Sequence, residues 1–342
     1  MASKPIHILD EIEFRSGQRA TFLAALEKRY RPQSEALGLR MRSLWLDPPL
    51  EVAGIASRAL IDWQLDGVDA FWSWRQGGLA NPDLAAFWSD AAPQIGRRVR
   101  RYAGSLESAG LEPVALEPQS GRAQPVPGLN RSVCLIRLRP GVADEERAQL
   151  ERALESAAGS AFASLGRNLP GTLFGSDYTW DLTGTLASPL IENLPAPLRS
   201  LISEHDEVAL DPIAGGVRAP AIANPIKRTL LLRVAPDASP SGVAEFERVL
   251  LLMPSHIGAI RNWCLSRAHD SRKGWTHVWE QDFAELSGLT DDYMNHPIHW
   301  SVVDPWFHPE DPRCIAAPAL AHVFYRAQRS VLSHVLAPAL EG

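Results

Sequence analysis

Cysteine is scarce in this chain, and its spacing carries no pattern. The three cysteines, Cys134, Cys264 and Cys314, lie far apart and never form a Cys-x-x-Cys pair. An odd number without such spacing provides neither a disulfide framework nor a zinc signature. We expect buried free thiols, because an isolated cysteine behaves as a small apolar side chain.

Long apolar runs and an excess of positive charge are also missing. No apolar run reaches the ~18 residues of a membrane span, and the N-terminal stretch has no signal-peptide core. We therefore expect a cytoplasmic protein. The net charge of -6 argues against a nucleic-acid partner. The basic cluster Arg97–Arg101 is typical of the solvated end of a helix; capture of a carboxylate or phosphate is the alternative.

Tryptophan, by contrast, is plentiful. The 342 residues include 11 tryptophans, and 45% hydrophobic with 22% charged residues is typical of a globular protein. The length predicts two or three domains. Most tryptophans are expected in cores, and a pocket lined by several of them would suit a flat aromatic ligand.

One pattern occurs three times along the chain, opening at 12–26, 135–154 and 231–250. Each copy has an apolar strand, a turn with Gly or Pro and an amphipathic helix. A strand pair and a further helix and strand follow. This strand–helix–strand–strand–helix–strand order is the split βαβ, or ferredoxin-like, unit.

The repeat predicts an α+β fold of three tandem ferredoxin-like copies. The first copy, degenerate, spans 1–115, and a Pro-rich linker spans 116–129. The second copy, also degenerate, spans 130–218, and the third spans 219–335. The glycine-rich stretch from Ala214 to Pro225 is expected to be a second, shorter linker. Helices cover one face of each antiparallel sheet, and the other face needs a partner.

Proton-transfer side chains gather in the third copy, where Tyr293–Trp300 reads Tyr-Met-Asn-His-Pro-Ile-His-Trp. A histidine titrates near pH ~6.5 and can accept and return a proton, and a phenol can hydrogen-bond a developing oxyanion. The alternative is a helix start that is rich in aromatic residues. Neither of the other copies keeps this set of residues.

A second group of candidates precedes this motif on a predicted strand. Strand alternation places Trp275, His277 and Trp279 on one face. This pattern predicts aromatic walls around a titratable group; a buried structural histidine is the alternative.

With these features the third copy resembles the stress-responsive A/B barrel (Dabb) family of dimeric α/β barrels, between Ile226 and Arg326. The resemblance rests on Lys227–Arg233, Gly274–His277 and Tyr293–His299. It implies ferredoxin-like sheets packed face to face into a barrel, with ligands between sheet and helices. It leaves one of three copies either to pair with its counterpart in a second chain or to be capped by helices, and we expect the pairing, which makes a homodimer.

The family includes olivetolic acid cyclase, a cofactor-free enzyme of aldol chemistry. The resemblance implies that His299 acts here as base and Tyr293 as oxyanion donor. Arg228 stands where that enzyme has a first-strand histidine, which suggests an anionic substrate group held by guanidinium. The residues predicted to contact the substrate are His277, His296, Trp275, Trp279, Arg228, His256 and Trp300.

The resulting hypothesis is a cofactor-independent lyase, cyclase or isomerase acting on an aromatic or polyketide-like small molecule. A monooxygenase or haem enzyme of the same superfamily and a non-catalytic small-molecule-binding stress protein are the alternatives. A metal site at His296 and His299 is a weaker alternative, because metal sites usually have tighter ligand sets. The loop Asp304–Pro312 is either a lid or a rigid connection, and Asp304 could orient a histidine.

Overall fold

The computed structural model describes residues 4–52, 54–104, 124–125, 131–158, 162–183, 191–269 and 271–340. The chain divides into two compact units. The first unit combines Met1–Pro113 with Asn295–Pro318, and the second combines Val114–Met294 with Ala319–Gly342. Each is described by itself. Apart from 124–125, the predicted linker 116–129 lies outside the described residues.

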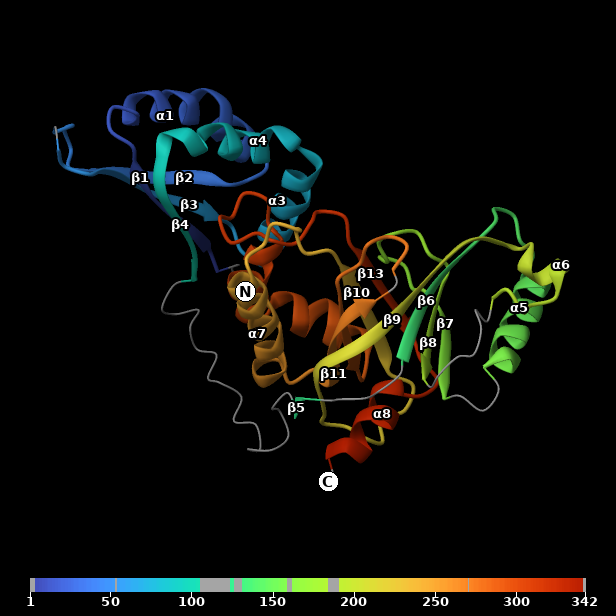
Figure 1. The fold of residues 1–342 in the computed structure, drawn as a ribbon. Helices are drawn as coiled ribbons and strands as arrows, with labels where there is room; N and C mark the ends of the chain where they lie inside the picture. Colours follow the sequence, from blue (N-terminus) through green and yellow to red (C-terminus); the bar gives the residue numbers. More distant parts are fainter. Residues whose placement is uncertain are drawn as a thin grey trace. The chain divides into compact units, whose positions relative to one another are not determined.

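The first unit is a four-stranded antiparallel sheet in the order β2-β3-β1-β4, with helices over one face (Figure 1). Its strands are β1 (Ile6–Phe14), β2 (Arg40–Asp47), β3 (Ser57–Leu65) and β4 (Ile95–Gly104). Its helices are α1 (Arg19–Ala25), η1 (Leu26–Tyr30), α2 (Arg31–Ala36), α3 (Val68–Ala80), α4 (Pro82–Ala91) and η2 (Ala92–Gln94). Alternate residues of β1 are buried, so Ile8 and Ile12 join a core that includes Phe22 and Trp63.

A distant segment of the chain completes the first unit. It contains η5 (Ile298–Val303) and η6 (Asp304–Phe307). Trp300 of η5 belongs to the unit's hydrophobic core and lies 6.1 Å from the ring of Phe71. Residues 295–318 are therefore part of this unit although they lie within the third copy in sequence.

The second unit is built on one nine-stranded sheet in the order β13-β10-β12-β11-β9-β6-β8-β7, with β5 paired to β9 beside this path. The strands are β5 (Gln124–Pro125), β6 (Arg131–Leu138), β7 (Ala163–Arg167), β8 (Tyr178–Thr183), β9 (Ile202–Val217), β10 (Ile226–Leu232), β11 (Ile260–His269), β12 (His277–Phe283) and β13 (Ala321–Arg326). The helices are α5 (Asp144–Ala157), α6 (Ala196–Arg199), α7 (Pro240–His256), η4 (Gly288–Tyr293) and α8 (Val331–Leu340).

The sheet of the second unit curls into a nearly closed barrel. The segment after β7 meets β13 at the other end of the sheet, where Leu169 N donates to Phe324 O at 2.9 Å and Leu173 N to His322 O at 2.8 Å. Figure 1 shows α5 and α7 on opposite sides of the curled sheet, and α8 packs against β8, β9 and β11.

Alternation along the strands separates the interior of the barrel from its outer layer. Val133 and Leu135 of β6 share a cluster with Val278 and Val323 of distant strands, which identifies the inner face. The outer face of β6 instead packs on Leu150 and Leu154 of α5. Helix α7 begins at Ser239, whose side chain accepts from Gly242 N at 3.1 Å, followed by Pro240.

The predicted α+β class is confirmed, and the predicted element order recurs in each of the three stretches. Each stretch also has the ferredoxin-like strand order 4-1-3-2. The second and third stretches, however, share one sheet and form a single compact unit.

The prediction of a linker from Ala214 to Pro225 is wrong for its first residues. Strand β9 continues to Val217 and pairs with β11. The glycines serve packing, since a Cβ on Gly216 would lie 2.2 Å from Cζ2 of Trp263. Strand glycines mark such close approaches as well as chain breaks.

Candidate functional site

Arg228 occupies the outer face of β10, on the side of the sheet that α7 covers. The side chain is 4% exposed. Its Nε donates to His322 Nε2 at 2.7 Å and its Nη1 to Gln281 Oε1 at 2.6 Å. The guanidinium carbon lies 4.9 Å from the ring centroid of Tyr293. The structure thus places Arg228, a predicted substrate contact, beside Tyr293, a predicted catalytic residue.

Among the residues that the structure describes, the hydrogen-bond partners of Arg228 include no carboxylate. Burial lowers the pKa of Arg228, and no carboxylate is among the described groups that oppose this effect. A buried guanidinium without a carboxylate retains a large desolvation penalty. Such a position suits the binding of an anionic group, for which arginine offers paired donors.

Tyr293 ends η4 and is 1% exposed. Its hydroxyl points to Met253 Sδ of α7 at 3.9 Å, and its ring meets the edge of Phe283 at 5.7 Å. The phenol is therefore packed between α7 and β12, with Arg228 over its ring.

His277 lies on β12 and links this strand to α7. Its Nε2 lies 3.1 Å from Glu247 Oε1 and its Nδ1 lies 2.9 Å from Thr276 Oγ1. Burial lowers the pKa of His277 and outweighs the hydrogen bond and charge of Glu247. Both ring nitrogens are engaged by the protein, which supports the structural alternative; ligand contact stays a prediction.

The expectation that Trp275 shares a face with His277 and Trp279 is wrong. Trp275 precedes β12 and belongs to the inner cluster with Val278, so the alternation of the strand does not extend to it. Its Nε1 donates to Asp206 Oδ2 at 2.7 Å. Trp279 is fully buried on the outer face.

His256 is the last residue of α7 rather than part of the following loop. Pro254 lies inside this helix, and the next turn is closed by a hydrogen bond from Ile257 N to Met253 O at 2.8 Å. His256 is half-buried there.

The histidines of the motif belong to the first unit. His299 is 9% exposed on η5, and its ring lies 4.9 Å from that of Trp72. His296 accepts a hydrogen bond from Ile298 N through Nδ1 at 3.2 Å, at the start of η5. The motif is continuous in sequence, but Tyr293 and His299 fall in different units.

The proline-broken loop 304–312 is anchored to the first unit by ion pairs. Asp304 pairs with Arg75 at 2.9 Å, and Arg75 also donates to Phe307 O at 2.6 Å. Both carboxylate oxygens of Asp304 accept from Arg75 Nε, and orientation of a histidine by Asp304 stays a prediction. Glu310 accepts from Trp88 Nε1 at 3.3 Å and from Tyr30.

The basic cluster does not end a helix, which corrects the first interpretation. Arg97–Arg101 lies on β4, where alternation turns Arg98 and Arg100 inward. Both pair with Asp10, at 3.1 and 2.8 Å, and Arg98 donates to Glu310 O at 2.7 Å. Part of the cluster therefore captures carboxylates of this chain.

The sequence did not predict a group of buried charged side chains that lies inside the barrel. Arg131 binds both oxygens of Glu280 at 2.8 Å and one of Asp181 at 2.7 Å, and Lys227 pairs with Glu280 at 2.8 Å. Charged residues at alternate positions of otherwise apolar strands were the available signal. Among the described residues there is no cluster of three or more His, Cys, Asp or Glu side chains that could hold a metal.

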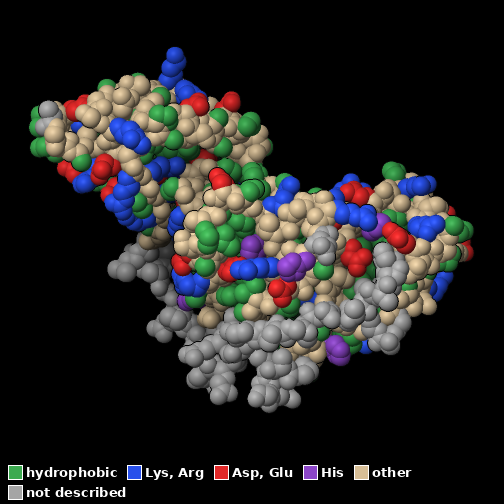
Figure 2. Space-filling view, in the orientation of Figure 1, with side chains coloured by type: hydrophobic (Ala, Val, Ile, Leu, Met, Phe, Trp, Pro, Cys, Tyr) green, Lys and Arg blue, Asp and Glu red, His purple; other side chains and the backbone are tan. Residues whose placement is uncertain are grey.

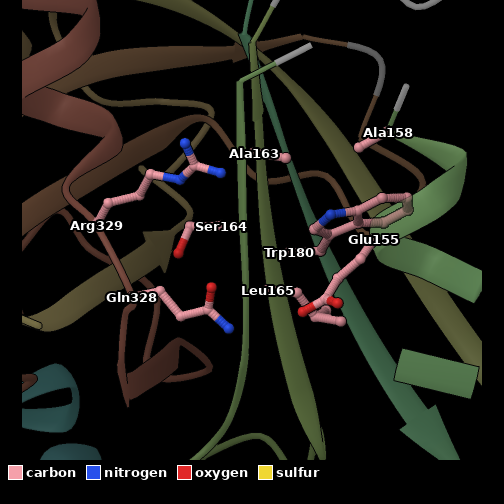
Figure 3. A pocket seen from close by; sticks show the side chains of 8 residues that line it. All are labelled: Glu155, Ala158, Ala163, Ser164, Leu165, Trp180, Gln328 and Arg329. Carbon is pink, nitrogen blue, oxygen red and sulfur yellow. The ribbon is translucent and has the colours of Figure 1, made fainter. Parts of the chain in front are cut away.

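Figure 3 shows a hollow beside β7 that the sequence did not indicate. Over the face of the molecule drawn in Figure 2, acidic and basic side chains are interspersed. No helix in the described part of the chain is long and apolar enough to cross a membrane.

Comparison with known proteins gives a family match for part of the chain. Residues 226–315 match the model of the Stress responsive A/B Barrel Domain. This match covers the outer-face residues Arg228 and Tyr293, and it continues into the segment of the first unit. No curated protein matches the chain.

Solved structures offer only distant likenesses. A candidate monooxygenase from Lactobacillus acidophilus is 8% identical over 59% of this chain and 94% of that one, with a TM-score of 0.40. An anthrone oxidase-like protein is 8% identical over 59% and 91%, with a TM-score of 0.41. A NIPSNAP domain protein from Burkholderia xenovorans is 16% identical over 33% and 98%, with a TM-score of 0.24. The strand order, not these values, establishes the fold.

Proposed function

We propose that this protein is a cofactor-independent lyase, cyclase or isomerase that acts on an aromatic or polyketide-like small molecule with an anionic group. The observation that carries the proposal is Arg228, buried with neutral hydrogen-bond partners and lying over the ring of Tyr293. The family match at 226–315 supports it, since the matched segment contains the whole Tyr293–His299 motif.

The proposed chemistry is proton transfer, which in a cyclisation is coupled to attack of the resulting carbanion on a keto carbon of the same molecule. The C–C bond forms as the C=O π bond opens, and the alkoxide that results takes up the proton. His299 takes a proton from an acidic C–H or phenol of the substrate, and Tyr293 donates a hydrogen bond to the oxygen that becomes negative. The proton returns to the substrate from His299. Arg228 binds a carboxylate or enolate through parallel N–H groups. No oxidant takes part in these steps.

The test uses a linear poly-β-keto thioester as substrate, with cyclised products followed by mass spectrometry. His299→Gln and Tyr293→Phe should each reduce turnover by about 100-fold or more, the usual contribution of a positioned acid or base. Arg228→Met should mainly raise KM, because it removes a binding contact. His269→Gln is the matched control, since His269 is exposed on β11.

Turnover close to wild type in both His299→Gln and Tyr293→Phe would contradict the proposed roles. Oxygen consumption that accompanies turnover would instead assign a monooxygenase. Ligand binding without any product would leave a binding protein.

A further inference from the structure

A hollow of about 230 Å³ opens at the edge strand β7 of the second copy. Glu155 and Ala158 of the α5 region, Ala163, Ser164 and Leu165 of β7, Trp180 of β8, and Gln328 and Arg329 line it. Arg228, Tyr293 and the other residues assigned to chemistry are not among the residues that line it.

Two buried donors in this hollow lack a partner within the described part of the chain. Ser164 is 5% exposed and Trp180 is 1% exposed. Among the residues that the structure describes, neither Ser164 Oγ nor Trp180 Nε1 has a hydrogen-bond partner. A buried polar group left unsatisfied costs about 1–3 kcal/mol. A ligand with acceptor atoms would remove this cost at both positions.

The charges of the hollow are arranged on two sides of β7. In Figure 3, Ser164, Gln328 and Arg329 lie on one side of the strand, whereas Trp180 and Glu155 lie on the other. The guanidinium of Arg329 lies 4.6 Å from the ring centroid of Phe162 and has no ion pair among the described residues. An anionic group therefore fits the side of Arg329, away from Glu155.

The size and walls of the hollow limit the ligand further. A cavity of ~150 Å³ accommodates benzene, so 230 Å³ has room for one ring with two polar substituents. Leu165, Ala158 and Ala163 supply apolar contact. We propose that this hollow binds a small hydroxylated aromatic carboxylate, whose carboxylate contacts Arg329, Ser164 and Gln328 and whose hydroxyl oxygen accepts from Trp180 Nε1.

The experiment titrates the full chain, labelled with 5-fluorotryptophan, with 4-hydroxybenzoate. The ¹⁹F resonance of Trp180 is assigned by its loss in Trp180→Phe. We expect a saturable shift of this resonance, because its indole N–H acquires an acceptor. Arg329→Gln should weaken the apparent affinity about tenfold, as expected for loss of one charge-assisted contact. Ser164→Ala should weaken it less.

The controls separate this site from other effects. Arg248→Gln, an exposed arginine of α7, should leave the titration unchanged, and the neutral 4-hydroxybenzamide should bind more weakly than the acid. Arg228→Met should also leave the Trp180 shift unchanged. A Trp180 resonance that does not move, or that moves equally in Arg329→Gln, overturns the proposal.

Discussion

Buried charges in the barrel differ in whether the chain itself neutralises them. Inside the barrel Arg131 and Lys227 share two carboxylates, Asp181 and Glu280. On the outer face Arg228 has neutral partners in the described part of the chain. Burial of a cation is tolerated when a carboxylate satisfies it. The contrast marks the inner group as structural and is the basis for the proposal that Arg228 binds an anionic ligand.

Glu280 gives a test of the inner group at the scale of one residue. Replacing it by Gln leaves Arg131 and Lys227 with Asp181 alone, so unfolding free energy should fall by about 3–5 kcal/mol. Urea denaturation followed by circular dichroism measures this loss. Glu245→Gln, which breaks an exposed pair on α7, should remain close to wild type. Equal midpoints for both variants would contradict a structural role.

The pKa of Glu280 also predicts how the stability of the folded state changes with pH. Burial would raise the pKa of Glu280, but attraction to Arg131 and Lys227 outweighs it and lowers the pKa to about 2. A lowered pKa stabilises the folded state at pH values above the unfolded value of ~4.3. This stabilisation should be lost as the pH falls toward about 2, and Glu280→Gln should show less of that loss.

At the scale of elements, periodicity predicted the order of strands and helices but not every boundary. Each copy opens with a strand followed by a helix, and this local pattern does not depend on how the copies pack against one another. The glycines of β9 and the arginines of β4 were misassigned because their roles depend on neighbours far away in sequence. The ring of Trp263 occupies the space that a side chain at position 216 would fill, and the guanidinium of Arg98 pairs with the carboxylate of Asp10.

Gly216 can be tested through the space that it leaves. A methyl group added by Gly216→Ala would meet the buried ring of Trp263, so unfolding free energy should fall by about 1–3 kcal/mol, as for an overpacked core. Thermal unfolding measures the change. Gly258→Ala is the matched control, because nothing lies within 4 Å of a Cβ at Gly258. A Gly216→Ala variant as stable as this control would show that β9 and Trp263 adjust freely.

At the scale of the whole molecule, proximity in sequence proved a poor guide to the candidate site. The motif suggested that its residues form one site, and the family model matches the segment that contains them. Yet the chain crosses from the second unit to the first between Met294 and Asn295. The motif allowed a chemical role to be proposed for each residue. The neighbours of each residue, however, depend on the hydrophobic core in which it packs. Trp300 illustrates this, since it packs in the core of the first unit.

The first unit should depend on its distant segment. A fragment of residues 1–113 lacks Glu310, which accepts hydrogen bonds from Tyr30 and Trp88 and lies 3.7 Å from Arg100. We expect this fragment to lack a cooperative thermal transition and to gain one when a peptide of residues 295–318 is added. Near-ultraviolet circular dichroism reports the change. A Glu310→Gln peptide should restore less, and a fragment that melts identically with and without peptide would contradict the dependence.

Strand β9 pairs with β6 along one edge and with β11 along the other, so it belongs to both halves of the barrel. In a barrel made of two chains, dilution separates the halves, and two-fold symmetry repeats every side chain. Here the encounter is intramolecular and survives any dilution. The halves are also released from symmetry, so one can carry Arg228 and Tyr293 while the other presents the hollow at Ser164 and Trp180.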